Sequence, residues 1–218
     1  MNALRIFLSR LHRDERAVAM IEFAYALPIF VALAVGGVEL THYITTKMRV
    51  SQLALHIADN AARIGSGSQL AAKTISESQI NDLFTGSGLQ AGELELYPKG
   101  RVILSSLEPI ANPNTADRYK IAWQRCRGAK NHASTYGVAN DTDLTGIGPT
   151  GRKVKAPEDG ATMFVEVYYT YKPIISTSYA PSLEITETAS MPVRDRRDTS
   201  QVYNTEQATP ASCATFST

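Results

Sequence analysis

The sequence is short of the residues that build metal and redox sites. Its 218 residues include only two cysteines and four histidines, and no Cys/His group has the spacing of a zinc site. The formal net charge is +1 at pH 7, so no excess of positive charge points to a nucleic-acid partner. No repeat with a period of tens of residues indicates a solenoid. We therefore expect no cofactor, no bound metal and no nucleic acid.

Catalytic motifs are also missing. The stretch "GIGPTG" at 146–151 matches a dinucleotide fingerprint literally, but no strand precedes it and Pro149 does not open a helix, so a turn-rich loop explains it better. No Ser/His/Asp or Cys/His grouping follows from spacing. We therefore expect that the protein is not an enzyme.

What the sequence does contain is one long apolar run, from Ala17 to Val38, whose only charged residue is Glu22. As a helix, about 22 residues span roughly 33 Å, enough for the hydrocarbon core of a bilayer. The pattern predicts a transmembrane helix over 18–39. A secretory signal has a shorter apolar core of about 7–15 residues, although the small residues of "LAVGG" leave late cleavage open.

Positive charge predicts the orientation of this helix. The preceding segment, 1–17, is a basic leader with four arginines, whereas two basic residues follow the helix closely: Arg5, Arg10, Arg13 and Arg16 before it, Lys47 and Arg49 after it. By the positive-inside rule, the leader is cytoplasmic and the remainder lies outside.

The helix is expected to continue past the membrane. Apolar residues recur at helical spacings over 40–64, at Tyr43, Val50, Leu53, Ile57, Ala61 and Ile64, with polar residues such as Thr46 and Gln52 on other faces. Gly65-Ser66-Gly67 then supplies a stop. The sequence predicts one helix from near Ala17 to Ile64, with an amphipathic second half that packs on a globular domain.

Glu22 has two explanations. Near the end of the span its carboxylate can reach the headgroups. Alternatively it receives a cationic partner, since carboxylates inside membrane segments are functional candidates. A new α-amino group, made by cutting the chain just upstream, is one such partner, and the helix dipole also favours a carboxylate there.

The stretch "RAVAMIEFAYALPIF" resembles the leader and helix start of TadE-like pseudopilins, the TadE/TadF/TadG-like family of the tight-adherence, or Flp, branch of type IV pilus systems. That family has a basic leader, a small residue (usually glycine, here Ala17), four residues, and then Glu-Phe or Glu-Tyr. The resemblance implies that a prepilin peptidase cuts between Ala17 and Val18. Glu22 would then be the fifth mature residue and Phe23 the sixth.

The resemblance also implies a function and a location. It implies a minor pilin-like subunit in the assembly of a Flp-type pilus, held in the bacterial inner membrane by a single span, with its C-terminal domain in the periplasm. Its partners would be the membrane, other pilin or pseudopilin subunits and the assembly machinery. The alternative is a membrane-anchored periplasmic binding module or enzyme unrelated to pili.

Residues 65–218 are predicted to form an extracytoplasmic α+β domain. A capping box, Ser76 with Gln79, predicts a helix over 76–85 that Gly86 stops. Alternating or β-rich runs predict strands at 93–97, 101–110, 118–126, 162–174 and 182–194. Strands that follow helices favour an antiparallel sheet with helices on one face, a layout that resembles pilins.

Two polar segments complete the domain. The loop 127–160 is long enough to be either functional or mobile, and the tail after Arg194 contains Cys213. Cys126 and Cys213 are either a disulfide, as an oxidising compartment favours, or two free thiols. We expect the disulfide, which would tie the tail to the domain.

Overall fold

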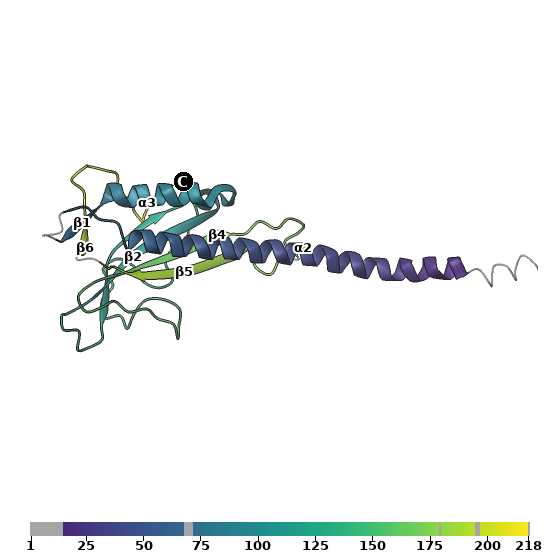
Figure 1. The fold of residues 1–218 in the computed structure, drawn as a ribbon, viewed down its shortest axis with the longest axis horizontal. Coiled ribbons are helices and arrows are strands. Elements are labelled where there is room, and N and C mark those ends of the chain that lie inside the picture. The colour runs from purple at the N-terminus through teal and green to yellow at the C-terminus, as the bar shows by residue number, and fades with distance from the viewer. Residues whose placement is uncertain (1–14, 68–71, 179, 195–196, 218) are drawn as a thin grey trace, which may run out of the picture. The chain divides into compact units, whose positions relative to one another are not determined.

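The computed structural model describes residues 15–67, 72–178, 180–194 and 197–217 (Figure 1). Most of the predicted leader, residues 1–14, lies outside them. The chain forms two compact units. One contains α2 up to Tyr43 together with Pro173–Pro181, and the other contains Ile44–Lys172 and the chain from Ser182 onward.

Helix α2 is a single helix of 47 residues, Glu15–Ala61, with Pro28 inside it. It ends three residues before the predicted Ile64, in a turn that leads to Gly65 at φ 140°. In its second half Val50, Leu53 and Ile57 are buried, as the apolar spacing predicts. Thr46 is buried with them, so its assignment to a polar outer face was wrong.

The domain is built on four antiparallel strands in the order β3-β2-β4-β5. They are β2 (Gly100–Pro109), β3 (Tyr119–Arg127), β4 (Thr162–Thr170) and β5 (Glu184–Pro192). Each was predicted from its pattern, although β4 ends four residues before the predicted limit, ahead of Pro173. The α+β class and the antiparallel sheet are confirmed.

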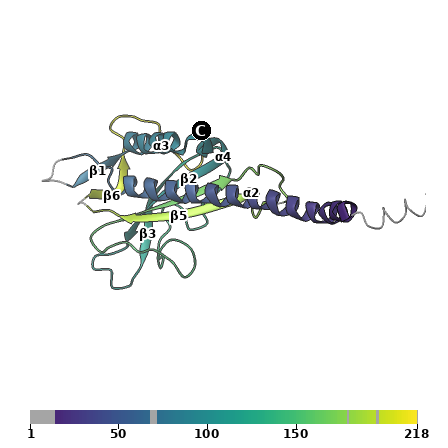
Figure 2. The same ribbon diagram turned by 45° about the vertical axis from the view of Figure 1, so that its right-hand side comes forward.

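Helices cover one face of this sheet (Figures 1 and 2). The register places Val102 beside Val167, and Val167 beside Glu187, on that face. Lys47 of α2 pairs with Glu187 at 3.7 Å, and Arg125 of β3 forms a bidentate pair with Glu77 of α3 (Glu77–Ala91). Glu187 and Arg125, two charged residues on this face, are thus each paired with a charge from a helix.

The long polar segment 127–160 covers the opposite face. Its sparse apolar residues complete a core with the strands, formed by Leu107, Tyr119, Ile121, Ile147, Ala156 and Phe164, with Tyr136 and Leu144 packed against it. Glu166 of β4, fully buried, accepts a hydrogen bond from Ser134 Oγ at 2.8 Å, and His132 Nε2 lies 3.0 Å from its carboxylate. The segment is therefore a structural layer of the domain.

Helix α3 begins where the sequence predicts and ends later. Gln79 N donates to Ser76 Oγ and Ser76 N donates to Gln79 Oε1, which completes the capping box. The predicted stop at Gly86 was wrong, because α3 continues to Ala91. Gly88, further along, brings the helix against the ring of Tyr97.

The stretch "ELELY" at 93–97 is mostly helical, so the strand predicted there was wrong. It forms a 3₁₀ turn, Gly92–Leu94, and a short helix α4, Leu96–Lys99. Leu96 and Tyr97 are both buried although they are consecutive, which a strand with one buried face does not allow. Tyr97 Oη bonds Ser87 Oγ, and burial raises the pKa of Tyr97 to about 12.

Two further strands were not predicted. β1 (Lys73–Ser76) pairs in parallel with β6 (Arg197–Tyr203). β6 also contacts the main sheet, where Trp123 Nε1 of β3 donates to the carbonyl of Thr199 at 2.8 Å. Both strands are short and mostly polar, so neither has the apolar alternation on which strand prediction depends.

The two glycines inside α3 give a matched test of the packing with Tyr97. A Cβ at position 88 would lie 2.8 Å from the Tyr97 ring, whereas a Cβ at 86 would meet nothing within 4 Å. We expect Gly88→Ala to lower the free energy of unfolding by about 1–3 kcal/mol through overpacking. We expect Gly86→Ala to raise it by about 0.5–1 kcal/mol, because alanine loses less entropy in a helix. Urea unfolding of the full chain in detergent, followed by Trp123 fluorescence, measures both, and equal effects would contradict this account.

Candidate functional site

The candidate site residues at the N-terminus lie on α2. Ala17 and Val18, the predicted cleavage pair, are both within the helix. Glu22 and Phe23 are exposed, Phe23 at 63%. Among the described residues, no hydrogen bond or ion pair reaches the Glu22 carboxylate. The carboxylate is therefore available to a partner from outside this chain.

The first half of α2 presents large apolar side chains on all sides. Phe23, Phe30 and Leu33 are each more than 60% exposed. The helix has a segment long and apolar enough to cross a membrane, and none of that segment is buried. A soluble helix exposing such a surface to water is unfavourable, so this half requires lipid or protein around it.

The second half of α2 has an exposed apolar stripe that the sequence analysis missed. Ile44, Met48 and Leu55 are 48%, 57% and 47% exposed, and exposed Ser51 lies between Met48 and Leu55. Their spacings of four, three and four residues place all four on one side of the helix. We call these four residues the outer stripe. The 44-48-51-55 spacing is present in the sequence, but Ser51 interrupts its apolar character, and the apolar set at 50, 53 and 57 has helical spacing too.

The outer stripe faces away from the core of the domain. Met48 is two residues from Val50, about 200° around the helix, and Val50 is fully buried. Alternating spacings of four and three residues are those of the a and d positions through which helices pack on other helices. The second half of α2 therefore packs on its own domain with one side and leaves the outer stripe exposed on the other.

Comparison with known families is consistent with these features. Residues 17–66 match the family model described as TadE-like protein. This segment is TadE-like. No curated protein and no solved structure matches the chain. The TadE-like segment contains Glu22, Phe23 and the whole outer stripe.

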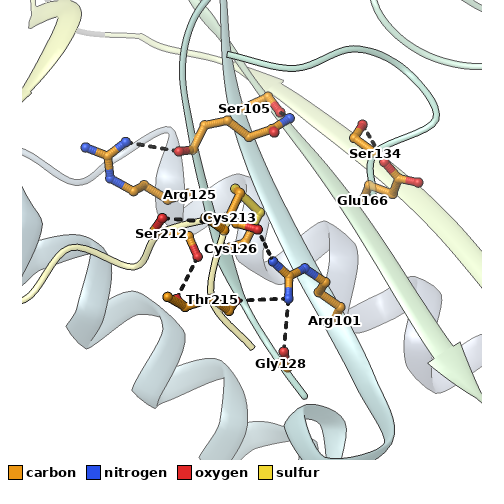
Figure 3. Close-up of a disulfide and its surroundings, with 12 residues drawn as sticks. Arg101, Ser105, Arg125, Cys126, Gly128, Ser134, Glu166, Ser212, Cys213 and Thr215 are labelled. Carbon is orange, nitrogen blue, oxygen red and sulfur yellow. Dashed lines mark hydrogen bonds between the residues drawn. A yellow bond between two sulfur atoms is a disulfide. The ribbon is translucent and has the colours of Figure 1, made fainter. Parts of the chain in front are cut away.

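Outside the TadE-like segment, the two cysteines join the C-terminal tail to the sheet (Figure 3). Cys126 and Cys213 form a disulfide with Cα atoms 4.7 Å apart. Cys126 N donates to the carbonyl of Ala211, and Gly128 N donates to that of Ser217. β3 is at one edge of the sheet, so the tail pairs with main-chain groups that would otherwise be an open edge.

A buried arginine holds the same tail. Arg101 of β2 is 1% exposed, and its guanidinium donates to the carbonyls of Gly128, Cys213 and Thr215 (Figure 3). Its Cζ lies 4.3 Å from the centre of the Phe216 ring. Burial lowers the pKa of Arg101, but arginine stays charged in proteins. The carbonyls and the ring therefore replace the water that this charge loses.

One cluster in the domain has the residue types of a hydrolase but another arrangement. Ser134 donates directly to Glu166, and His132 also contacts Glu166. The His132 ring stacks on the Tyr168 ring, with their centroids 4.2 Å apart. A nucleophilic serine must instead donate to the histidine. The cluster attaches the 127–160 segment to β4.

The disulfide should stabilise the domain measurably. Its cysteines are 87 residues apart, and closing a loop of this length contributes about 4–5 kcal/mol as an upper value. We expect Cys126→Ser/Cys213→Ser to lower the free energy of unfolding by about 2–5 kcal/mol and to make the tail sensitive to protease.

Reduction of the wild-type protein is the matched control, because it breaks the same bond without a substitution. Non-reducing peptide mapping should recover the two cysteine peptides joined. Free alkylation of both thiols in folded, unreduced protein would contradict the pairing.

Proposed function

We propose that this protein is a pseudopilin, a minor pilin-like subunit that acts in the assembly of a Tad, or Flp-type, pilus. The observation that carries the proposal is the outer stripe. The TadE-like match covers the apolar half of α2 and this stripe alike. A helix that only tethers a domain needs an apolar surface within the bilayer. That role does not explain why Met48 and Leu55 are exposed on the part of α2 that follows the apolar run.

In the proposed topology, the protein has a single span in the bacterial inner membrane. Four arginines in residues 1–17 against Lys47 and Arg49 after the span favour a cytoplasmic leader and a periplasmic domain. The Cys126–Cys213 disulfide supports this orientation, because such bonds persist in oxidising compartments.

In the proposed mechanism, a prepilin peptidase cuts between Ala17 and Val18, and Glu22 then meets a cation when α2 joins a bundle of similar helices. The cation is the new amine of Val18 or a basic side chain of a partner helix. Two unit charges about 4 Å apart attract by about 4 kcal/mol at an effective dielectric of about 20. Phe23 and its exposed apolar neighbours would pack on the same partner helices.

The role we propose is structural, and it includes no catalytic step. The work of the molecule is helix–helix packing, first in the membrane and then in the pilus or its assembly platform. The domain on α2 would give the subunit its specific contacts with other periplasmic components.

Glu22→Gln tests the electrostatic part of this mechanism. It keeps the shape of the side chain and removes its charge, so we expect pilus assembly and co-purification of partner subunits to fall at matched membrane abundance, with the domain still folded. Glu93→Gln, at an exposed carboxylate outside the TadE-like segment, is the control. Normal assembly with Glu22→Gln would show that the charge is incidental.

Met48→Glu tests the outer stripe. A carboxylate in a helix–helix seam is desolvated without a partner, so we expect pilus assembly to be lost while the variant domain unfolds at the wild-type urea concentration. Leu89→Glu places the same charge at an 80% exposed apolar position of α3, outside the TadE-like segment, and should assemble normally. If both variants assemble alike, the stripe has no role in assembly.

A further inference from the structure

Glu39 is the first residue after the apolar run of α2, and its side chain is fully buried. Its Oε2 accepts hydrogen bonds from the backbone N–H groups of Ile174, at 3.1 Å, and Ile175, at 2.9 Å. These two residues lie in the connection between β4 and β5, 135 and 136 positions further along the chain. A single carboxylate therefore holds the start of this connection, residues 173–178, against the helix.

The connection is unusual because the two residues that bond Glu39 have apolar side chains that are exposed. Ile174 is 59% exposed and Ile175 is 43% exposed. Val38 and Leu40, which flank Glu39 on α2, are 55% and 48% exposed. Scattered exposed apolar residues are common on proteins, but here two of them are held by one buried carboxylate and two flank it on α2. All four lie next to a helix surface that already requires lipid or protein.

The position of Glu39 along α2 indicates what surrounds these exposed side chains. A run of about 22 residues fills the hydrocarbon core, so the residue after Val38 lies where the hydrocarbon meets the headgroups. Water is absent from the hydrocarbon just below this level, so a fixed acceptor stabilises backbone N–H groups that lie near it. The Glu39 carboxylate supplies partners for two of them, and they in turn stabilise its charge.

We propose that residues 173–178 enter the headgroup layer of the bilayer that α2 crosses, with Ile174 and Ile175 in contact with lipid. The partner is a lipid surface, and Glu39 is a positioning residue that holds the connection at this depth. The inference rests on the proposed function only in taking α2 as membrane-spanning. Its consequence is a second contact with the bilayer, which restricts rotation of the helix about its own axis.

Tryptophan fluorescence tests the depth of the connection. The full chain is reconstituted in phosphatidylethanolamine–phosphatidylglycerol vesicles whose acyl chains carry bromine, a contact quencher. Ile174→Trp should lose fluorescence in brominated vesicles and emit at shorter wavelength than in water. Trp123 is 4% exposed and present in every variant, so the signal of the wild-type protein is subtracted.

Two matched variants calibrate the measurement. Phe30→Trp, at a 65% exposed position of the apolar run, should be quenched. Val138→Trp, at a 51% exposed position of the 127–160 segment, should not. Quenching of Phe30→Trp without quenching of Ile174→Trp would overturn the lipid contact and leave the membrane span intact. Equal quenching of Ile174→Trp and Val138→Trp would overturn it too. If Phe30→Trp is not quenched, the span and the lipid contact are both wrong.

Glu39→Ala, combined with Ile174→Trp, tests the positioning role. Without the carboxylate the two N–H groups lose their acceptor, so the connection should leave the headgroup layer and most of the quenching should be lost, while quenching of Phe30→Trp in the same background stays. Full quenching of Ile174→Trp in the Glu39→Ala background would overturn the role of Glu39.

Discussion

Strand β4 is buried on both faces of the sheet, and the rest of the domain depends on covering both. Val165 and Val167 on one face and Phe164 and Glu166 on the other are all almost inaccessible to water. The helices α2 and α3 cover the first face. On the second face, the described part of the chain supplies an irregular segment and a tail, and Glu166, Arg101 and the disulfide attach these to the sheet.

Helix α2 is under a different constraint, because the two halves of one helix have different surroundings. Its first half exposes apolar side chains all round, whereas its second half buries one side and exposes the outer stripe on another. The outer stripe lies on the side of the helix that does not pack on the domain. The TadE-like match extends over both halves.

Much of this could be predicted because the signals were local. The Ser76–Gln79 capping box lies within four residues, and the strands β2 to β5 have apolar or alternating runs of their own. The apolar run from Ala17 to Val38 likewise predicted that the first half of α2 is a helix of membrane-spanning length. Where prediction failed, distant partners decided the outcome. α3 passes through Gly86 and Gly88 because Tyr97 packs on it, and the bond between Glu39 and Ile174 joins segments 135 residues apart.

The pairing of β1 with β6 has a consequence for the order of events during synthesis. β1 follows α2 closely in the chain, but its partner strand β6 begins at Arg197. Cys126 likewise pairs with Cys213, near the end of the described residues. On a chain made from its N-terminus, the membrane segment emerges more than 150 residues before these partners do. The helix can therefore form while the domain is still incomplete, and the domain closes only after the segment that contains Arg197 and Cys213 has been synthesised.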